Sequence, residues 1–572
     1  MSFLANDPEM LELLDLQDQA TPPTHGDVLL PGVGGGKDVA LVGGAYDAAS
    51  RFDKEVALWR PSIRSADSDL IADKPIIDSR VRDTVRNDAY AAAGSEIRKD
   101  NIVGSMFLLN SKPNAKVLGL DEVWEEEYQE EVEAKFTLYA ESLNNYVDAS
   151  GINGFTGLIR LGVGLSGLTG EILATSEWLE DGRPFGTAIQ MVDTDRLSTP
   201  PNLRGNDRIR GGVERDRYGR PIAYHIRMAH PTDFLNPDAY QWKRVKARKP
   251  WGRQQVIHIF EQFRPDQNRG VSRMVSALKE TRITKRFRDV VLQNAVINAT
   301  YAASIESDLP TEAVYQMLGG GQLDPATIAK AVQSYAGGYM SAIDLFMSNA
   351  KNLSIDGVKI PHLMPGTKLQ MRPAGQGGPL GTDFEQSLLR YIAAMLGVSY
   401  EQLSKDYSKT NYSSARAAMN ETYKTMQANK RMTADRLATS IYLLWLEEAF
   451  AKGEITSLPR KAPSFWEGLN REAYGACEWI GASRGQIDEL KETQAAVLRL
   501  KYGLSTREDE LARLGKDWRK VFAQLEREKR IAEERGLVFM EDDNMMNATT
   551  GAPRETEAKD EKDDGSEDNA DA

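Results

Sequence analysis

The sequence predicts an α+β fold in which long helices accompany one mainly β module. A stretch without Gly or Pro runs from Val398 to Lys452 and carries apolar residues at helical spacing. Short β-rich runs, separated by turn residues, gather between residues 170 and 262. Because the two patterns occupy separate stretches of the chain, we expect helices and sheet to segregate.

Composition indicates a globular chain with one strongly acidic end. The chain has 572 residues, 41% of them hydrophobic, and a formal net charge of −13. Residues 541–572 contain twelve acidic and three basic side chains, so we expect the acidic tail, 536–572, to be disordered. No apolar run approaches the ~18 residues of a membrane span, and the lone Cys477 permits no internal disulfide. We therefore expect no membrane association and no secretory signal in Met1–Leu14.

The N-terminal half begins with an arm and continues as helices. Prolines and a three-glycine run make residues 1–45 an arm, and helices are expected over 46–111. A helix is predicted over 121–147 because four large side chains recur at i, i+4 spacing: Trp124, Tyr128, Val132 and Phe136. The β module follows, with four expected strands: Ile172–Trp178, Gly186–Val192, Pro221–Met228 and Val256–Phe260.

The C-terminal half is predicted to be mainly helical. A helix over 272–305 precedes a Gly- and Pro-rich stretch of mixed structure, 306–380. Thr382 and Glu385 form a capping-box pattern, and Gly397 ends the short helix that they start. A single helix is then expected from Ser413 to Phe450, with further helices over 483–501 and 506–535.

Two glycine motifs invite a nucleotide-binding interpretation, and both fail on detail. Lys37 follows three glycines, but Pro31 stands where a phosphate loop needs its first Gly, and Asp38 stands where it needs Ser or Thr. Gly162, Gly164 and Gly167 are spaced as GxGxxG, but a strand follows them and not a helix. No histidine pair has metal-binding helical spacing, and Cys477 is best interpreted as a small core residue. We expect no catalytic centre, metal or cofactor.

Two basic clusters stand out against the acidic background. One spans Lys243 to Arg253, and the other lies on the helix after Ser272. Phosphate contact and pairing with acids of another subunit are both open for each cluster.

Several segments, in a shared order over much of the chain, resemble the lambda family of phage portal proteins. They are Arg80–Asn87 with Asn101–Gly104; Gly170–Trp178 with Asp193–Ser198; Gly211–Asp216 with Tyr218–His225; Val256–Phe260 with Arg264–Ser272; Tyr400–Ser404 with Tyr412–Arg416; and Trp479–Gly481, Ile487–Asp488, Lys491–Glu492 and Gly503–Arg507. One departure is Glu489, where the family usually has Pro after the Ile-Asp pair.

The resemblance implies a phage portal fold with wing, stem, clip and crown regions, assembled as a ring that is typically dodecameric. It divides the chain as follows: arm 1–45, wing 46–271, first stem helix 272–305, clip 306–381, second stem helix 382–398, tunnel loop 399–412, long helix and wing–crown junction 413–464, crown 465–535 and acidic tail 536–572.

The resemblance also implies a function and partners. A portal ring is a structural channel, not an enzyme, through which double-stranded DNA enters the capsid during packaging and leaves during ejection. The implied partners are other copies of the chain, DNA, the terminase large subunit, a head-completion or adaptor protein and the major capsid protein. The implied location is the capsid vertex of the virion, with the host cytoplasm as the place of assembly.

Two sets of side chains are candidates for DNA contact. In the tunnel loop they are Lys405, Tyr407, Lys409 and Tyr412; in the first stem helix they are Arg282, Lys285, Arg286 and Arg288. The alternative for the lysines is solvation or pairing with Glu401 and Asp406. The alternatives for the whole chain are another phage structural protein, such as a capsid or baseplate component, and a DNA-packaging enzyme.

Overall fold

The computed structural model describes residues 58–300, scattered positions between 330 and 341, residues 353–355 and 358–360, residues 382–485 apart from Lys409, and residues 488–537. Two compact units divide the chain, Met1–Arg64 and Ser65–Ala572. The described part of the first unit, 58–64, contains no helix or strand. Everything below concerns the second unit. Among the described residues, no helix has the length and apolarity needed to cross a bilayer.

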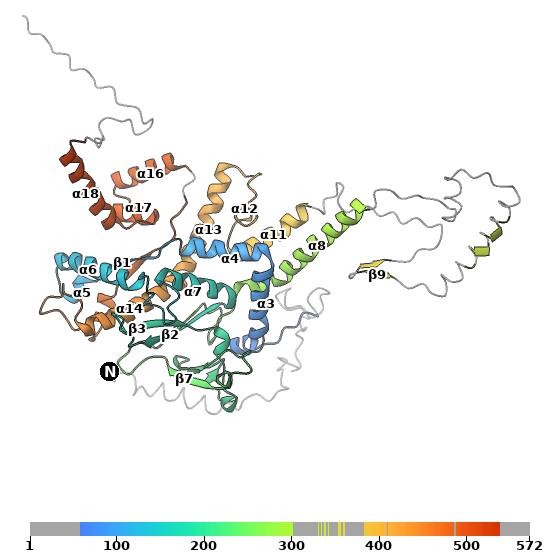
Figure 1. The fold of residues 1–572 in the computed structure, drawn as a ribbon, viewed down its shortest axis with the longest axis horizontal. Helices are drawn as coiled ribbons and strands as arrows, with labels where there is room; N and C mark the ends of the chain where they lie inside the picture. Colours follow the sequence, from blue (N-terminus) through green and yellow to red (C-terminus); the bar gives the residue numbers. More distant parts are fainter. Residues whose placement is uncertain are drawn as a thin grey trace, which may run out of the picture. The chain divides into compact units, whose positions relative to one another are not determined.

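Helices and sheets occupy different stretches of the second unit, as an α+β fold requires (Figure 1). The first part is helical apart from one strand: α2 (Ala66–Leu70), α3 (Lys74–Asn87), α4 (Ala89–Ile102), β1 (Leu108–Ser111), α5 (Ala115–Leu118), α6 (Glu122–Ala140) and α7 (Phe155–Thr169). The β module follows: β2 (Glu171–Trp178), β3 (Thr187–Met191), β4 (Ile209–Arg210), β5 (Val213–Arg215), β6 (Pro221–Arg227), β7 (Trp242–Lys246) and β8 (Val256–Phe260).

The second half returns to helices. Its elements are the 3₁₀ turn η5 (Arg273–Ala277), α8 (Leu278–Thr300), β9 (Leu353–Ile355), β10 (Val358–Ile360), α11 (Thr382–Leu396), α12 (Tyr400–Ser404), α13 (Tyr412–Met432), α14 (Ala434–Lys452), α15 (Asn470–Tyr474), β11 (Cys477–Ile480), α16 (Glu489–Lys501), α17 (Arg507–Arg513) and α18 (Trp518–Arg535). Gly397 ends α11 in the left-handed conformation, as the sequence predicted.

All four expected strands are present, in two antiparallel sheets. β2 is the central strand of the sheet β3-β2-β8, and β6 lies inside the sheet β4-β5-β6-β7. A further pair joins distant parts of the chain, because β1 pairs with β11 and places Leu108 opposite Ile480. The body is therefore closed by a strand from near each end of the second unit.

The hydrophobic core centres on α14. Leu437, Ile441, Tyr442 and Trp445 are fully buried on it, and α14 contacts α7, β3, β8 and β11. The glycines of α7 permit this packing, since a Cβ on Gly162 would approach Leu437 Cδ2 to 2.5 Å. The three glycines of the GxGxxG spacing therefore lie within a helix and not in a nucleotide loop, and Gly162 allows the close packing of that helix.

A buried charged centre links α3, the first sheet and the segment before α8. Glu171 is fully buried and accepts hydrogen bonds from Arg269 at 2.6 Å and from the Gly270 backbone at 2.8 Å. His258 lies 3.1 Å away and Lys74 3.3 Å away. Burial opposes the charge, yet Arg269 and Lys74 hold the pKa of Glu171 well below its usual range. We call Glu171, Lys74, Arg269, His258 and Asp78 the charged centre.

Several predicted helices differ from the structure. The stretch predicted to be helical over 46–111 ends in the strand β1, and the helix predicted over 483–501 begins only at Glu489. The single helix expected from Ser413 to Phe450, within 413–464, is two helices, because Thr433 leaves the helical path between α13 and α14. The helix expected over 506–535 is likewise divided, into α17 and α18, and the helix expected over 121–147 ends at Ala140. The expected tunnel loop, 399–412, begins with the short helix α12. The arm, most of the clip and the tail beyond Leu537 lie outside the described residues.

Candidate functional site

The two helices that flank the Gly- and Pro-rich stretch pack against each other at the base of α8 (Figure 1). Phe287 of α8 and Phe384 of α11 meet edge to face with ring centroids 5.2 Å apart. Arg288 Nε lies 3.9 Å from a carboxylate oxygen of Glu385. The turn η5 contacts both helices, so the pair is anchored in the body through the segment that follows the charged centre.

The four candidate cations on α8 divide into two kinds. Lys285 donates to the Asn87 carbonyl at 3.0 Å, and Arg288 pairs with Asp88 at 3.0 Å while lying over the Tyr90 ring. Arg282 and Arg286 are exposed and make no hydrogen bond or ion pair within the described part of the chain. Lys285 and Arg288 therefore hold α8 against the α3–α4 junction, and the other two are available to an outside anion.

The candidate tunnel loop is held at both ends by capping boxes. Ser399 and Gln402 cap α12, and Asn411 and Ser414 cap α13. Thr422 Oγ1 donates to Gln402 Oε1 at 3.0 Å, so α12 is tied to α13. The short intervening loop is thus fixed at its ends by local hydrogen bonds.

Within this loop the structure describes two of the four candidates fully. Lys405 is exposed and ends α12 with φ +59°, and it forms no ion pair with Glu401 or Asp406 in the described residues. Tyr407 is half exposed. Lys409 lies outside the described residues, and Tyr412 begins α13 but its side chain lies outside the description.

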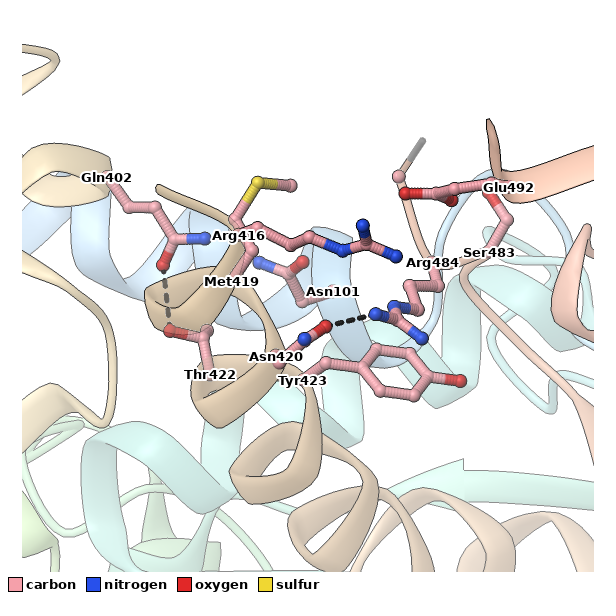
Figure 2. Close-up of a pocket in the computed structure, with 11 residues that line it drawn as sticks. Asn101, Gln402, Arg416, Met419, Asn420, Thr422, Tyr423, Ser483, Arg484 and Glu492 are labelled. Atoms are coloured by element: carbon pink, nitrogen blue, oxygen red, sulfur yellow. Dashed lines mark hydrogen bonds between the residues drawn. The ribbon is translucent and has the colours of Figure 1, made fainter. Parts of the chain in front are cut away.

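A polar pocket lies where α13 meets the segment 483–485 (Figure 2). Arg484 donates to Asn420 and lies over the Tyr423 ring, while Arg416 extends across from α13. Glu492 also lines the pocket and supplies a carboxylate there. This pocket lies between α13 and the C-terminal helices. The Glu492 carboxylate offsets part of the positive charge that Arg416 and Arg484 bring to it.

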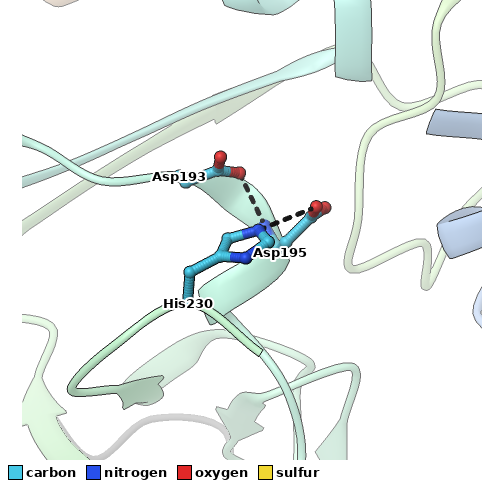
Figure 3. A group of neighbouring side chains, drawn as sticks. All are labelled: Asp193, Asp195 and His230. Carbon is cyan, nitrogen blue, oxygen red and sulfur yellow. Dashed lines mark hydrogen bonds and ion pairs between the residues drawn. The ribbon is translucent and has the colours of Figure 1, made fainter. Parts of the chain in front are cut away.

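Asp193, Asp195 and His230 form the one cluster among the described residues with metal-ligand geometry (Figure 3). Arg82 occupies its carboxylates, since Nη2 lies 3.0 Å from Asp195 Oδ1 and 3.3 Å from Asp193 Oδ1. Burial acts against the charge of Asp195, but the hydrogen bonds and charges of Arg82 and His230 together outweigh it and lower the pKa of that carboxyl. The cluster therefore ties α3 to the β module as an ion-pair network and does not suit a cation.

The remaining reactive side chains have structural partners. His225 lies 3.3 Å from Glu214, and His258 belongs to the charged centre; His25 and His362 lie outside the described residues. Burial raises the pKa of the Cys477 thiol to about 12, so it stays protonated at neutral pH. In the basic cluster from Lys243 to Arg253, Arg244 pairs with Glu214 and Arg253 donates to the Leu444 carbonyl.

A second pocket escaped the sequence analysis. It lies between α4, α7, η5, the end of α11 and α13, and Arg98 projects from α4 into its wall. Nothing in the sequence distinguishes Arg98 from the other arginines of helices, because the absence of a counter-charge is a property of packing.

Comparison with known proteins places these features in one family. The family model described as "Phage portal protein, lambda family" matches residues 52–430, more than half of the chain. The portal protein of Escherichia phage N15 is 36% identical over 496 residues, which cover 86% of this chain and 91% of the relative. Portal protein B of Escherichia phage lambda is 35% identical over 487 residues, 85% and 89% of the two chains.

Solved structures give a weaker likeness. A chain in the neck of an empty gene transfer agent particle matches with 14% identity and a TM-score of 0.37, over 78% of this chain and 93% of that one. The family assignment therefore rests on the family model and the sequence relatives alone. The chain belongs to the lambda family of phage portal proteins.

Proposed function

We propose that the chain forms the portal vertex of a phage capsid, as a closed ring whose axial channel carries double-stranded DNA inward during packaging and outward during ejection. The proposal rests on the match to the portal family model and on two portal proteins that are similar to this chain over about nine tenths of their own length. A ring follows when one head-to-tail interface repeats until it closes on itself, and twelve copies is the number we propose.

The charge distribution suits a channel through which DNA slides. Each phosphate that a protein neutralises adds salt-dependent affinity, and many such contacts would hold the duplex in place. A ring of subunits with net charge −13 avoids that outcome. A few exposed cations then make brief contacts, and we assign this role to Lys405 and Lys409, with Tyr407 and Tyr412 beside them, and to Arg282 and Arg286 on α8.

The regions of the portal fold map onto the elements as follows. The wing is the body up to residue 271, the stem is α8 with α11, the clip is 306–381, the tunnel loop is 399–412, and the crown is 465–535. The clip is the surface that we propose for the packaging motor, the terminase large subunit, and later for the head-completion or adaptor protein. The wing would meet the major capsid protein, with assembly in the host cytoplasm.

Lys285 and Arg288 take a different role from their neighbours on α8. Because both already bind the α3–α4 junction, we propose that they set the direction in which the stem leaves the wing. The role of the chain is accordingly structural, without catalysis or a cofactor.

Imaging of the purified full-length chain by electron microscopy tests the proposal. The expected particle is a ring with an axial opening wide enough for B-form DNA. A chain that stays monomeric under capsid-assembly conditions, or a particle without such an opening, overturns the proposal.

The tunnel contact is tested separately from the ring. Lys405→Ala combined with Lys409→Ala is expected to reduce DNA retention in filled capsids while rings still form. Unchanged packaging and retention would remove the tunnel contact and leave the portal assignment in place.

A further inference from the structure

The pocket beside Arg98 contains a guanidinium that has no anionic partner. Arg98 donates through Nη2 to Ser166 Oγ at 3.2 Å, and this is its one hydrogen bond within the described residues. Its Nε atom is buried without any partner. Burial lowers the pKa of Arg98 to about 10, and the like charge of Arg273 acts in the same direction. Some of the side chain remains accessible, so the pocket opens to the surface at this residue.

Burying a charge without a counter-ion is costly, and folded proteins rarely retain such a group without a use for it. Glu261 is the acidic side chain whose charge acts on Arg98, but its carboxylate is paired with Arg273 at 2.6 Å. Arg98 is therefore left as the unmatched charge of this pocket, which lacks any acidic side chain in its wall.

The wall of the pocket limits what can enter. It combines Arg98, Arg273, Ser95 and Asn429 with apolar side chains of α7, η5 and α11: Val163, Leu168, Met274, Met395 and Leu396. Gly167 leaves one side open, since a Cβ there would meet no atom within 4 Å. Cations beside apolar side chains suit a carboxylate on a short aliphatic stem. A DNA phosphate, carried between bulky sugars and strongly hydrated, does not suit such a wall.

Acidic side chains of this kind are abundant on the surface of the same chain. The outward face of α6 carries four exposed glutamates that form no ion pair within the described residues: Glu122, Glu126, Glu127 and Glu130. The chain as a whole has 84 acidic against 71 basic residues. A second copy therefore supplies both the charge and the number of carboxylates that the pocket requires.

We propose that the pocket between α4, α7, η5 and α11 is a socket that receives a carboxylate side chain from a second copy of this chain, with Arg98 as its charge partner. The inference rests on the proposed ring and specifies one contact of its subunit interface. It also places that contact next to η5, so a neighbouring subunit would bind where α8 and α11 leave the body.

Two substitutions test the socket by different routes. Arg98→Met removes the charge and keeps most of the volume, whereas Gly167→Leu fills the open side and keeps the charge. The matched control is Arg160→Met, which removes a partly exposed α7 arginine that binds Glu96 and Asp100 on α4. Each variant is allowed to assemble over a range of chain concentrations. Analytical ultracentrifugation then measures the fraction of the chain that is in rings.

Both socket variants are expected to raise the concentration needed to assemble half of the chain by about tenfold, and the control is expected to assemble as the wild type does. The melting temperature of the isolated Arg98→Met subunit should equal or exceed the wild-type value, because an uncompensated guanidinium has been removed. In a structure of the ring, a carboxylate of the neighbouring copy should lie within hydrogen-bond distance of Arg98.

Normal assembly of both socket variants overturns the inference, and so does a ring in which only water or a buffer anion contacts Arg98. An Arg98→Met subunit that melts below the Arg160→Met control also overturns it, since Arg98 would then stabilise its own subunit. A wild-type chain that never forms rings overturns the proposed function as well, which separates the two failures.

Discussion

Arg269 and Arg98 show opposite ways of placing a guanidinium within the body of the protein. Arg269 donates to Glu171 and to the carbonyls of Thr194, Leu197 and Gly211, so its guanidinium is fully used. Arg98 has one hydroxyl partner and a buried Nε with none. A charge whose partners lie in the same chain stabilises the fold, whereas a charge without them points to a partner elsewhere.

The largest expected effect comes from Glu171→Gln. The substitution leaves Arg269 and Lys74 buried without a full counter-charge, and losing one member of such a group costs about 3–5 kcal/mol. Urea unfolding of the isolated chain measures the loss. Glu478→Gln, which breaks an exposed pair with Lys112, should cost about 0–1 kcal/mol. A loss at Glu171 as small as that of the control would show that the centre does not depend on charge.

The second effect tests the close approach that forms the centre. A Cβ on Gly170 would lie 2.1 Å from the Val271 carbonyl carbon, and the residue has φ +78°. Gly170→Ala should therefore cost about 2–5 kcal/mol, the sum of left-handed strain and overpacking. Gly182→Ala has φ +85° but open space around it, so it measures the strain without the clash. Equal losses for the two variants would contradict a steric role at Gly170.

The third effect concerns Asp78, a carboxyl of the charged centre whose ionised form is disfavoured by burial. Burial, aided by the negative charge of Glu171, raises the pKa of Asp78 to about 6 despite the Lys74 ammonium 3.0 Å away. A raised folded-state pKa gives stability that is complete below the ordinary value of 3.8 and is lost as the pH rises through about 6.

In Asp78→Asn the side chain does not titrate, so the variant lacks this pH-dependent loss of stability. The difference in unfolding free energy, variant minus wild type, should rise by about 2–3 kcal/mol between pH 4 and pH 7. Denaturant titrations at several pH values give this difference directly. A difference that stays constant with pH would mean that Asp78 remains ionised throughout.

The smallest effect separates the four cations of α8 by the same rule. Arg282→Ala with Arg286→Ala should leave the melting temperature unchanged and reduce the salt dependence of duplex binding by about two phosphate contacts. Lys285→Ala with Arg288→Ala should lower stability by about 1 kcal/mol with a smaller change in salt dependence. Filter binding at several salt concentrations distinguishes them, and identical slopes for the two pairs would contradict the division.

Local patterns predicted much of the fold. The strands of the β module and the end of α11 at Gly397 lie where alternation and turn residues place them. The break at Thr433 was missed because no Gly or Pro marks it in the sequence. There the Lys430 ammonium donates to the Trp479 carbonyl of β11 and pairs with Asp435. A segment without Gly or Pro carries no sign of such a contact.

The candidate site was less predictable than the fold. The sequence pattern grouped Arg282, Lys285, Arg286 and Arg288 as one basic cluster, but only the packed structure shows that two of them already bind the α3–α4 junction. Glu171 directly precedes the expected strand Ile172–Trp178, and its partners Lys74 and Arg269 are distant in sequence. Whether a charge has a partner is decided by long-range packing.

The pairing of β1 with β11 has a consequence for synthesis of the chain on the ribosome. Leu108–Ser111 leaves the exit tunnel long before its partner Cys477–Ile480 has been translated. At about 5–20 residues per second, the first strand waits for roughly 20–70 s with its backbone groups unpaired. The β1–β11 pair of the nascent body therefore cannot form until most of the chain has been translated.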